Sequence, residues 1–504
     1  MGYAKVRSVA LHGVAGEVIV VEADVAPGLP SLVVSGLPDA ALSEARDRVR
    51  AAVHNSGAHW PQARITVNLR PAHVRKHGSG FDTAVAIAVL AAGADLPIAR
   101  LGNAVVLGEL GLDGTVRPVR GVLPAVLAAS RAGYGFALVP LENVNEARLV
   151  TDIDVRATDS LGRIIGYLYE TQDLLDPDPE PRPMEAAALD LADVLGQERG
   201  RRVIELAAAG RHHVAMFGPP GAGKTMLAAR LPGVLPPLDD KESIEVTALH
   251  SIAGNLAPDG TLIRRAPIQA PHHTASVTAL VGGGPGFARP GAISLAHHGV
   301  LFLDECAEFS AGVLDALRQP LEEGKVRLRR SYGETVYPAR AQLVMAANPC
   351  PCARPGGRQM CHCPSIVRRR YQARLSGPLM DRVDLQVDLD PVRSAALLTT
   401  ETVEPSSVIA ERVLDAREAA GARWGKHANS NGEVPASLLR DNRFRLSRHV
   451  LHPLTIEMDR GRLSARGFER SIRVAWTIAD LEGRTQPDVA HVREALELRS
   501  RTVQ

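Results

Sequence analysis

The chain has 504 residues, with 58 lysines and arginines against 56 aspartates and glutamates, which leaves a formal net charge of +2. This balance excludes an electrostatic field over the whole protein that would attract polyanions. Any surface that binds nucleic acid must therefore be a local cluster of basic residues. No apolar run reaches the roughly 18 residues of a membrane-spanning helix, and no cationic segment leads into an apolar signal core at the start. We expect about three domains in a cytoplasmic protein without a membrane anchor.

Residues 1–170 are predicted to form an α+β domain. A hairpin is expected over 105–119 with Asp113-Gly114 at its turn, followed by a helix over 123–132 and a strand over 137–143. This series resembles the proteolytic domain of Lon-type proteases, which shares its fold with a ribosomal S5 domain.

The resemblance also indicates what this domain lacks. It places Gly80 where the catalytic serine belongs and Leu123 where its lysine partner belongs. Ser79 is one residue out of register, and no lysine lies near position 123, whereas a Ser–Lys dyad needs both groups within hydrogen-bond reach. We therefore predict a protease-like domain without protease activity, whose role in ring assembly, partner docking or nucleic-acid binding stays open.

A proline-rich segment divides the chain. Residues 173–183 contain four prolines that alternate with charged residues, a pattern that excludes a helix or a central strand. We predict an exposed, stiff linker over 171–188 that separates the first domain from a nucleotide-binding part.

Residues 218–225 fit the phosphate-loop pattern G-x-x-x-x-G-K-[ST], between an apolar run over 213–217 that predicts a strand and a run over 226–230 that predicts a helix. Glycines let backbone N–H groups turn inward around phosphate oxygens, and the helix N-terminus adds partial positive charge. Lys224 is expected to reach the β- and γ-phosphates, and the Thr225 hydroxyl to hold Mg²⁺. The expected ATP contacts are Gly218, Pro219, Pro220, Gly221, Ala222, Gly223, Lys224 and Thr225.

Two later strands are predicted to end in polar side chains. An apolar strand leads into Asp304 and Glu305, which are suited to hold Mg²⁺ and to polarise the attacking water. The strand over 342–347 leads into Asn348, which alone would more often form a turn but here follows a phosphate loop and an acid pair in order.

These motifs, together with residues 317–324, 346–350 and 375–385, resemble the magnesium-chelatase-like AAA+ ATPases and, among them, the YifB/ComM subfamily, over essentially the whole chain. The resemblance implies an α/β AAA+ core over 189–390, a helical lid over 391–504 that completes the nucleotide site, and a ring of six subunits. It implies that Asn348 is sensor 1, Arg382 the arginine finger and Arg466 sensor 2. Gln197 is expected to flank the adenine.

Two insertions are candidates for substrate contact. Residues 270–286 are predicted to form a loop that interrupts a helix, and 325–337 a β-hairpin with its turn at 332–334. Period 2 places Lys325, Arg327 and Arg329 on one face, where with Tyr332 they could track a DNA backbone, although a solvated hairpin fits equally. We prefer a loop role to metal binding for His272-His273.

A Cys-rich insertion spans 350–363. Its four thiols suit a structural Zn²⁺ ion, with His362 as an alternative ligand, while free or redox-active thiols remain an alternative; the predicted ligands are Cys350, Cys352, Cys361 and Cys363. Cys306 is expected to be a buried filler. The run Arg368, Arg369 and Arg370 is either a nucleic-acid contact or a solvated helix face.

Three functions fit these features. The resemblance favours a DNA-acting AAA+ motor that consumes ATP with Mg²⁺. A magnesium-chelatase-type chaperone that remodels a protein partner is the alternative, and an ATP-dependent protease is disfavoured by the missing dyad.

Overall fold

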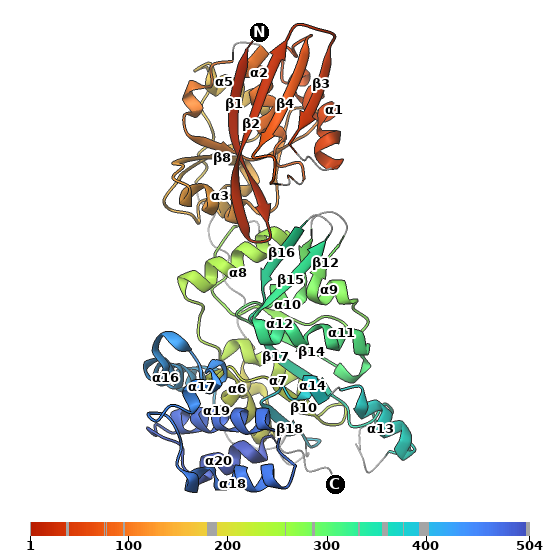
Figure 1. Ribbon diagram of the computed structural model, residues 1–504, viewed down its shortest axis with the longest axis vertical. Coiled ribbons are helices and arrows are strands. Elements are labelled where there is room, and N and C mark those ends of the chain that lie inside the picture. Colours follow the sequence, from red (N-terminus) through yellow and green to blue (C-terminus); the bar gives the residue numbers. More distant parts are fainter. Residues whose placement is uncertain are drawn as a thin grey trace.

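The computed structural model describes residues 2–36, 40–74, 76, 78–93, 96–178, 189–257, 259–284, 288–330, 333–354, 361–375, 377–392 and 403–499. The chain forms an elongated stack, with the N-terminal domain at one end, a nucleotide-binding core in the middle and a helical lid at the other end (Figure 1). Among the helices of these residues, none is long and apolar enough to cross a lipid bilayer.

The N-terminal domain is built on a seven-stranded mixed sheet of order β3-β4-β2-β1-β5-β8-β9. Its strands are β1 (Tyr3–His12), β2 (Ala15–Ala26), β3 (Ser31–Ser35), β4 (Arg64–Arg70), β5 (Ala104–Val106), β8 (Phe136–Pro140) and β9 (Asp154–Thr158). Its helices are α1 (Ala40–Asn55), α2 (Asp82–Gly93), α3 (Val122–Arg131), α4 (Val144–Ala147) and α5 (Leu161–Leu168). The predicted hairpin is confirmed in a short form, since β6 (Glu109–Leu110) pairs with β7 (Val116–Arg117) across the Asp113-Gly114 turn. The predicted helix and strand after it are α3 and β8.

The core contains a five-stranded sheet of order β11-β14-β17-β10-β18 in which all pairs are parallel. Its strands are β10 (Val214–Phe217), β11 (Ile268–Gln269), β14 (Val300–Leu303), β17 (Gln342–Ala347) and β18 (Leu385–Asp388). Strands β10, β14 and β17 are continuous apolar runs because helices cover both faces of a parallel sheet. The flanking helices include α6 (Glu198–Gly210), α7 (Lys224–Arg230) and α8 (Asp240–Ala253).

Short elements surround this sheet. They are α9 (Val277–Val281), β12 (Gly282–Gly283), β13 (Arg289–Pro290), α10 (Ala292–Leu295), α11 (Ala311–Ala316), α12 (Arg318–Glu323), β15 (Lys325–Arg330), β16 (Gly333–Pro338), α13 (Ser365–Ala373) and α14 (Gly377–Met380). The prediction of a loop over 270–286 is wrong in one respect, because residues Val277–Val281 in its middle form the helix α9. Ser276 caps this helix by accepting a hydrogen bond from the Ala279 N–H.

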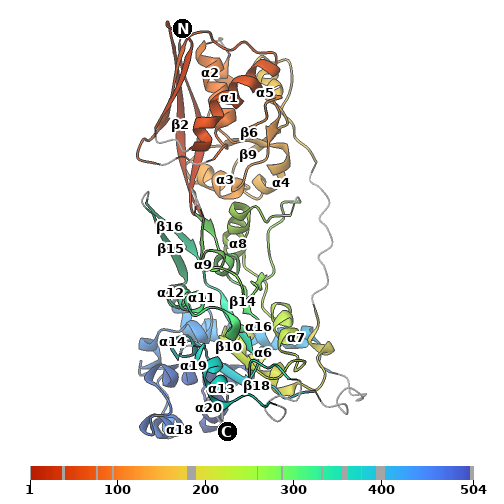
Figure 2. The same ribbon diagram turned by 90° about the vertical axis from the view of Figure 1, so that its right-hand side faces the viewer.

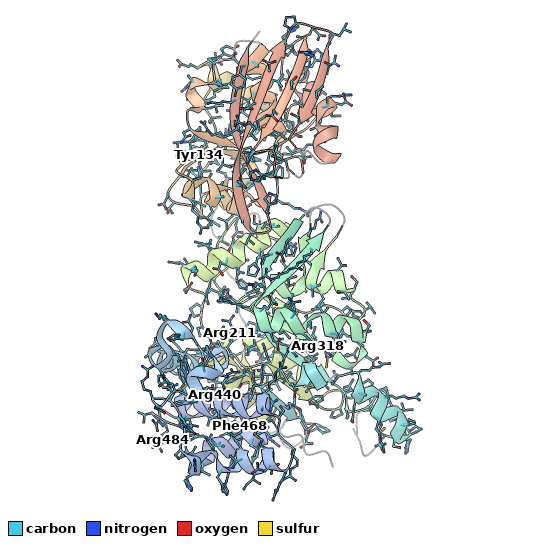
Figure 3. The ribbon with its side chains drawn as sticks, viewed as in Figure 1. Tyr134, Arg211, Arg318, Arg440, Phe468 and Arg484 are labelled. Atoms are coloured by element: carbon cyan, nitrogen blue, oxygen red, sulfur yellow. The ribbon has the colours of Figure 1, made fainter. Side chains whose placement is uncertain are left out.

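The lid is helical, as predicted. It consists of α16 (Ser406–Trp424), α17 (Ala436–Leu439), α18 (Arg448–Asp459), α19 (Ala465–Leu481) and α20 (Val489–Glu497). Trp424 and Trp476 are buried in a core shared with α6 and one face of the central sheet. Arg211, at the C-terminus of α6, lies at the junction of core and lid and pairs with Glu433 of the lid at 3.2 Å (Figure 3).

The N-terminal domain rests directly on the core. Ser251 of α8 donates a hydrogen bond to the buried carboxylate of Glu146, and the Gly121 N–H donates to the Ser251 carbonyl at 3.3 Å. The turn between β1 and β2 approaches β16 so closely that a Cβ on Gly13 would lie 2.6 Å from the Val336 carbonyl oxygen.

The predicted linker is only partly free of the first domain. Leu175 bridges Ala157 at the sheet edge, and Asp176 pairs with Arg148 and Arg156. The first part of the 171–188 segment therefore packs on the N-terminal domain, while residues 179–188 lie outside the described residues.

Candidate nucleotide site

The phosphate loop occupies the carboxyl end of β10, at the centre of the parallel sheet, and leads into α7. Gly221 and Gly223 adopt φ values of +79° and +81°, which glycine adopts without strain. Gly218 is required for a different reason, since a Cβ there would lie 2.6 Å from the Leu389 carbonyl oxygen. The sequence thus folds here into a turn that directs backbone groups inward ahead of a helix N-terminus, which is the arrangement that binds phosphate.

Lys224 is buried at the first position of α7. Its Nζ donates to the carbonyls of Gly218 at 2.7 Å and Pro219 at 2.9 Å, and to Oδ1 of Asn348 at 3.2 Å. Burial lowers the pKa of Lys224, although Asp304 and Glu305 oppose this effect. The ammonium group is therefore held at the end of the sheet by groups that a phosphate oxygen can replace.

The acid pair follows β14 and faces the start of α7. The Thr225 hydroxyl donates to Oδ2 of Asp304 at 2.8 Å, and the Glu305 N–H donates to Oδ1 of Asp304 at 2.8 Å. Glu305 has a φ of +49°, a left-handed conformation, and its carboxylate is half-exposed. Hydroxyl and carboxylate oxygens are the ligands that Mg²⁺ prefers, so Thr225 and Asp304 fit that ion.

One residue near this site was not predicted from the sequence. His273, expected only to belong to a loop, has its Nδ1 3.4 Å from Oε2 of Glu305. The His272-His273 pair was a visible signal, but no spacing rule connects it to an acid more than 30 residues later. Gln197, predicted to flank the adenine, is buried and donates from Nε2 to the Asp390 carbonyl at 2.7 Å.

Arg382 and Arg466 lie elsewhere. Arg382 Nη2 is 2.5 Å from Oε1 of Glu322 on α12, and Arg466 Nη2 is 3.6 Å from the same oxygen. Arg382 precedes β18, whose first residue, Leu385, pairs with Val214 at the amino end of β10. The phosphate loop follows the opposite, carboxyl end of β10. The four residues of this strand separate its two ends by about 13 Å, at about 3.3 Å per residue.

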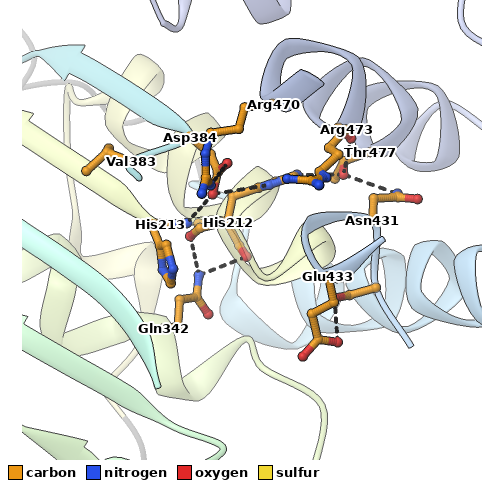
Figure 4. A network of polar contacts seen from close by, with 12 residues as sticks. His212, His213, Gln342, Val383, Asp384, Asn431, Glu433, Arg470, Arg473 and Thr477 are labelled. Atoms are coloured by element: carbon orange, nitrogen blue, oxygen red, sulfur yellow. Dashed lines mark hydrogen bonds and ion pairs between the residues drawn. The ribbon is translucent and has the colours of Figure 1, made fainter. Parts of the chain in front are cut away.

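A polar network fixes the lid at this amino end of the sheet (Figure 4). Arg470 of α19 donates to Oδ1 of Asp384 at 2.6 Å, and the His213 N–H donates to Oδ2 of Asp384 at 2.9 Å. His212 Nε2 lies 2.7 Å from the Thr477 hydroxyl. Burial alone would raise the pKa of Asp384, but Arg470 and the two histidines hold it well below its usual range.

The expectation that the lid completes a nucleotide site stays a prediction. Arg466 is the second residue of α19, the helix that this network fixes at the amino end of β10. Figure 2 shows the lid helices at the end of the molecule opposite to the N-terminal domain.

The protease-like domain has no dyad among its described residues. Leu123 is buried, and the Ser79 hydroxyl donates to the Glu109 carboxylate. Lys76 is fully buried, and its Nζ donates to the carbonyls of Gly36, Leu69 and Pro71. This lysine is held away from Ser79 by backbone groups.

The predicted hairpin is confirmed as β15 and β16, which pair from Lys325↔Pro338 to Arg330↔Gly333. Arg330↔Gly333 is the last pair of the hairpin, and Tyr332 falls outside the described residues. Val326 faces the core, whereas the side chain of Arg329 is 82% exposed. Arg327 and Arg329 both approach Glu334, at 3.6 Å and 3.3 Å.

The structure brings the four cysteines of the insertion together and does not include His362 among them. Arg368, Arg369 and Arg370 lie on α13, which follows the second cysteine pair and projects from the core (Figure 1). Cys306 is buried, as predicted for a filler.

A parallel sheet of this order defines an AAA+ ATPase core, with a phosphate loop after its central strand, an acid pair after β14 and an amide after β17. Comparison with known proteins narrows the class. Models described as Magnesium chelatase, subunit ChlI, Subunit ChlI of Mg-chelatase, and Magnesium chelatase, subunit ChlI C-terminal match residues 190–397, 21–143 and 403–499.

Similar proteins cover nearly the whole chain. An uncharacterized protein of Mycobacterium tuberculosis, Rv2897c, is 53% identical over 99% of both chains. Competence protein ComM of Haemophilus influenzae is 39% identical over 99% of this chain and 98% of its own, and YifB of Escherichia coli is 38% identical over 99% and 97%. A Lon protease of Rhizobium meliloti matches 38% of the chain at 26% identity. The chain belongs to the YifB/ComM family of magnesium-chelatase-like AAA+ ATPases.

Proposed function

We propose that this chain is an ATP-hydrolysing ring motor that acts on DNA. The observation that carries the proposal is the meeting of Lys224, Asp304 and Asn348 at one end of the sheet, on the same core as an arginine-bearing hairpin. The hairpin extends from the core toward the N-terminal domain (Figure 1). A cytoplasmic location is part of the proposal, because the substrate would be found there.

In the proposed hydrolysis, Lys224 exchanges its carbonyl partners for oxygens of the β- and γ-phosphates. Thr225 and Asp304 would hold Mg²⁺, which supplies neutralisation of the phosphate charge. Glu305 is the group proposed to polarise the attacking water, since its carboxylate is exposed beside Asp304. Asn348, already bonded to Lys224, orients that water.

The positions of the arginines support a ring. Arg382 and Arg466 lie at the edge of the sheet opposite to their own phosphate loop, so neither is placed to stabilise charge on the phosphate bound there. We propose that both act on a nucleotide held by a neighbouring subunit in a ring of six.

The action on DNA is supported by the hairpin. Alternation along β15 directs Val326 inward and Lys325, Arg327 and Arg329 to the other face. Glu323 and Glu334 accompany these arginines, and phosphate oxygens can replace those carboxylates. The name of the Haemophilus influenzae relative, competence protein, points in the same direction.

Other contacts and cofactors complete the proposal. Among the described residues, Arg368, Arg369 and Arg370 have no ion-pair partner, which suits a second DNA contact. The cysteine cluster is proposed to hold a structural Zn²⁺ ion, because four thiolates form the typical ligand set of that metal. The domain bounds 1–170, 189–390 and 391–504 are kept as a proposal.

The test is the steady-state ATPase rate with and without single-stranded and branched DNA at two salt concentrations. We expect several-fold stimulation that falls with added salt, because cations compete for the phosphates. The double variant Arg327→Ala/Arg329→Ala should lose the stimulation and keep the basal rate. The matched control, Arg460→Ala/Arg462→Ala, removes two exposed lid arginines that share one glutamate. A rate that no DNA changes would instead favour remodelling of a protein partner, as in magnesium chelatase.

A further inference from the structure

The sulfur atoms of Cys350, Cys352, Cys361 and Cys363 all lie within 4.8 Å of one another. Sγ of Cys350 lies 3.1 Å from Sγ of Cys361 and 3.5 Å from Sγ of Cys352. All four cysteines are free thiols. Four thiolates around one tetrahedral Zn²⁺ ion, each about 2.3 Å from the metal, stand about 3.8 Å apart. The cluster therefore has the size and the soft ligand chemistry of a closed zinc site.

The cluster joins two segments that matter for hydrolysis. Cys350 is buried and follows Asn348 by two residues at the end of β17. Cys363 precedes Ser365, the first residue of α13, by two residues. A metal ion at this point would thus fix the start of α13 to the strand end that carries Asn348.

The far end of α13 is fixed to the acid pair. Arg374 Nη1 donates to the Ala307 carbonyl at 3.1 Å and lies 3.0 Å from Oε2 of Glu308, in the short turn that follows Glu305. Gln372 Nε2 donates to the Pro349 carbonyl at 3.4 Å. Helix α13 therefore contacts both the Asn348 segment and the Glu305 segment.

The space between these contacts is not filled. A cavity of about 180 Å³ lies between α13 and the sheet, lined by side chains that include Phe217, Asn348, Pro349, Tyr371 and Gln372. A metal cross-link at the start of α13 would therefore add to the hydrogen bonds of Gln372 and Arg374.

We propose that the four cysteines bind one Zn²⁺ ion and that this site, through α13, positions Asn348 and Glu305 for ATP hydrolysis. Gln372 and Arg374 are positioning residues in this arrangement. The inference rests on the proposed ATP hydrolysis and is independent of the proposed action on DNA.

The first measurement is metal content. We expect one zinc ion per chain in the purified protein, and a tetrahedral Co²⁺–thiolate absorption spectrum when Co²⁺ replaces it. Cys361→Ser should lose the metal. Cys306→Ser is the control for metal content, since burial raises the pKa of that thiol to about 12 and it lies outside the cluster. Substoichiometric zinc in the wild-type chain, or disulfides in its place, would overturn the metal site.

The second measurement separates positioning from folding, in the absence of DNA. Removing zinc from the wild-type chain with a chelator should lower kcat about three- to tenfold and leave ATP affinity unchanged, because positioning errors act on the reaction step. Readdition of Zn²⁺ should restore kcat. Arg374→Ala should lower kcat while it keeps the metal, and Ile366→Ala, on the exposed face of α13, should do neither.

An unchanged kcat in the zinc-free chain would overturn the positioning role. A chain that hydrolyses ATP with these dependences but ignores DNA would contradict the proposed motor function and leave this inference standing.

Discussion

Arg382 and Arg466 lie against the same carboxylate oxygen, Oε1 of Glu322, although 84 residues of sequence separate them. Arg382 comes from the segment before β18 and Arg466 from the start of α19, and Glu322 on α12 brings them together. The two cations therefore form one unit at the amino end of the sheet, whereas Lys224 and Asn348 form another at its carboxyl end.

The first prediction uses this separation. Lys224→Ala and Arg382→Ala should each abolish ATP hydrolysis, because each removes one half of a shared site. An equal mixture of the two variants should recover up to about a quarter of the wild-type rate, since random assembly unites an intact Lys224 with a neighbour's intact Arg382 at about one interface in four. The ATPase rate of mixed rings measures this recovery.

Exchange of subunits must be shown for the mixture, for example by transfer of a fluorescent label between rings. A mixture that exchanges subunits and stays inactive would place Arg382 in the site of its own chain and remove the argument for action between subunits.

The second prediction concerns the phosphate loop. Thr225→Ala should reduce the ATPase rate by at least about 100-fold, because it removes a metal ligand and leaves Oδ2 of Asp304 without its 2.8 Å partner. Its ATP binding should weaken less than its hydrolysis, as measured by fluorescent-nucleotide titration beside kcat. Thr261→Ala, in a loop far from β10, is a matched control, and an effect of equal size there would indicate a general loss of folding.

The third prediction concerns the attachment of the lid. Asp384→Asn should destabilise the core and lid by about 3–5 kcal/mol, because Arg470 loses the partner of a buried ion pair. Hydrogen exchange should accelerate mainly in α19 and β18. Asp441→Asn, at an exposed ion pair with Arg443, is the control and should change little. Unaltered exchange in α19 would show that the apolar contacts of Trp476 fix the lid unaided.

The fourth prediction concerns pH. Nδ1 of the buried His297 accepts the Arg340 N–H at 3.0 Å, and burial lowers the pKa of this ring from 6.5 to about 4. The unfolded chain takes up a proton near pH 6.5 and the folded chain does not, so stability falls by up to roughly 3 kcal/mol between pH 6.5 and pH 4. His297→Asn should flatten this part of the curve, as measured by thermal unfolding at several pH values.

The neighbouring carboxylates act in a different range. Hydrogen bonds to the histidines lower the pKa of Glu242 and Glu245 to about 2, so their stabilisation is present above about pH 4.5 and is lost only below it. A wild-type slope between pH 6.5 and pH 5 that His297→Asn leaves unchanged would assign the effect to another group.

Much of the site could be predicted because it depends on local pattern. The phosphate loop needs glycine at positive φ before a buried lysine, and these residues are adjacent in the sequence. Asp304 and Asn348 end apolar runs, and parallel strands bring such ends to one edge. For the same reason, the β15–β16 hairpin and the helical lid agree with the predicted elements.

The rest depends on tertiary packing that the pattern does not contain. The ion pair between Asp384 and Arg470 decides how the lid attaches to the core, and these two residues are 86 positions apart in the sequence. Likewise, Glu322 gives no local signal that it will meet two arginines, and His273 none that it will approach Glu305. Lys76 gives no local signal of its role, because its three carbonyl contacts depend on the folded sheet.

The close approach of Gly13 to β16 has a mechanical consequence. The β1–β2 turn lies against the Val336 carbonyl of β16, the strand that pairs with β15 and its residues Arg327 and Arg329. A hairpin that tilts during ATP hydrolysis cannot move toward this turn without displacing it. The first domain must therefore either move together with the hairpin or limit its movement. If the proposed ring forms, the contact at Gly13 would limit hairpin movement from outside the ATPase core.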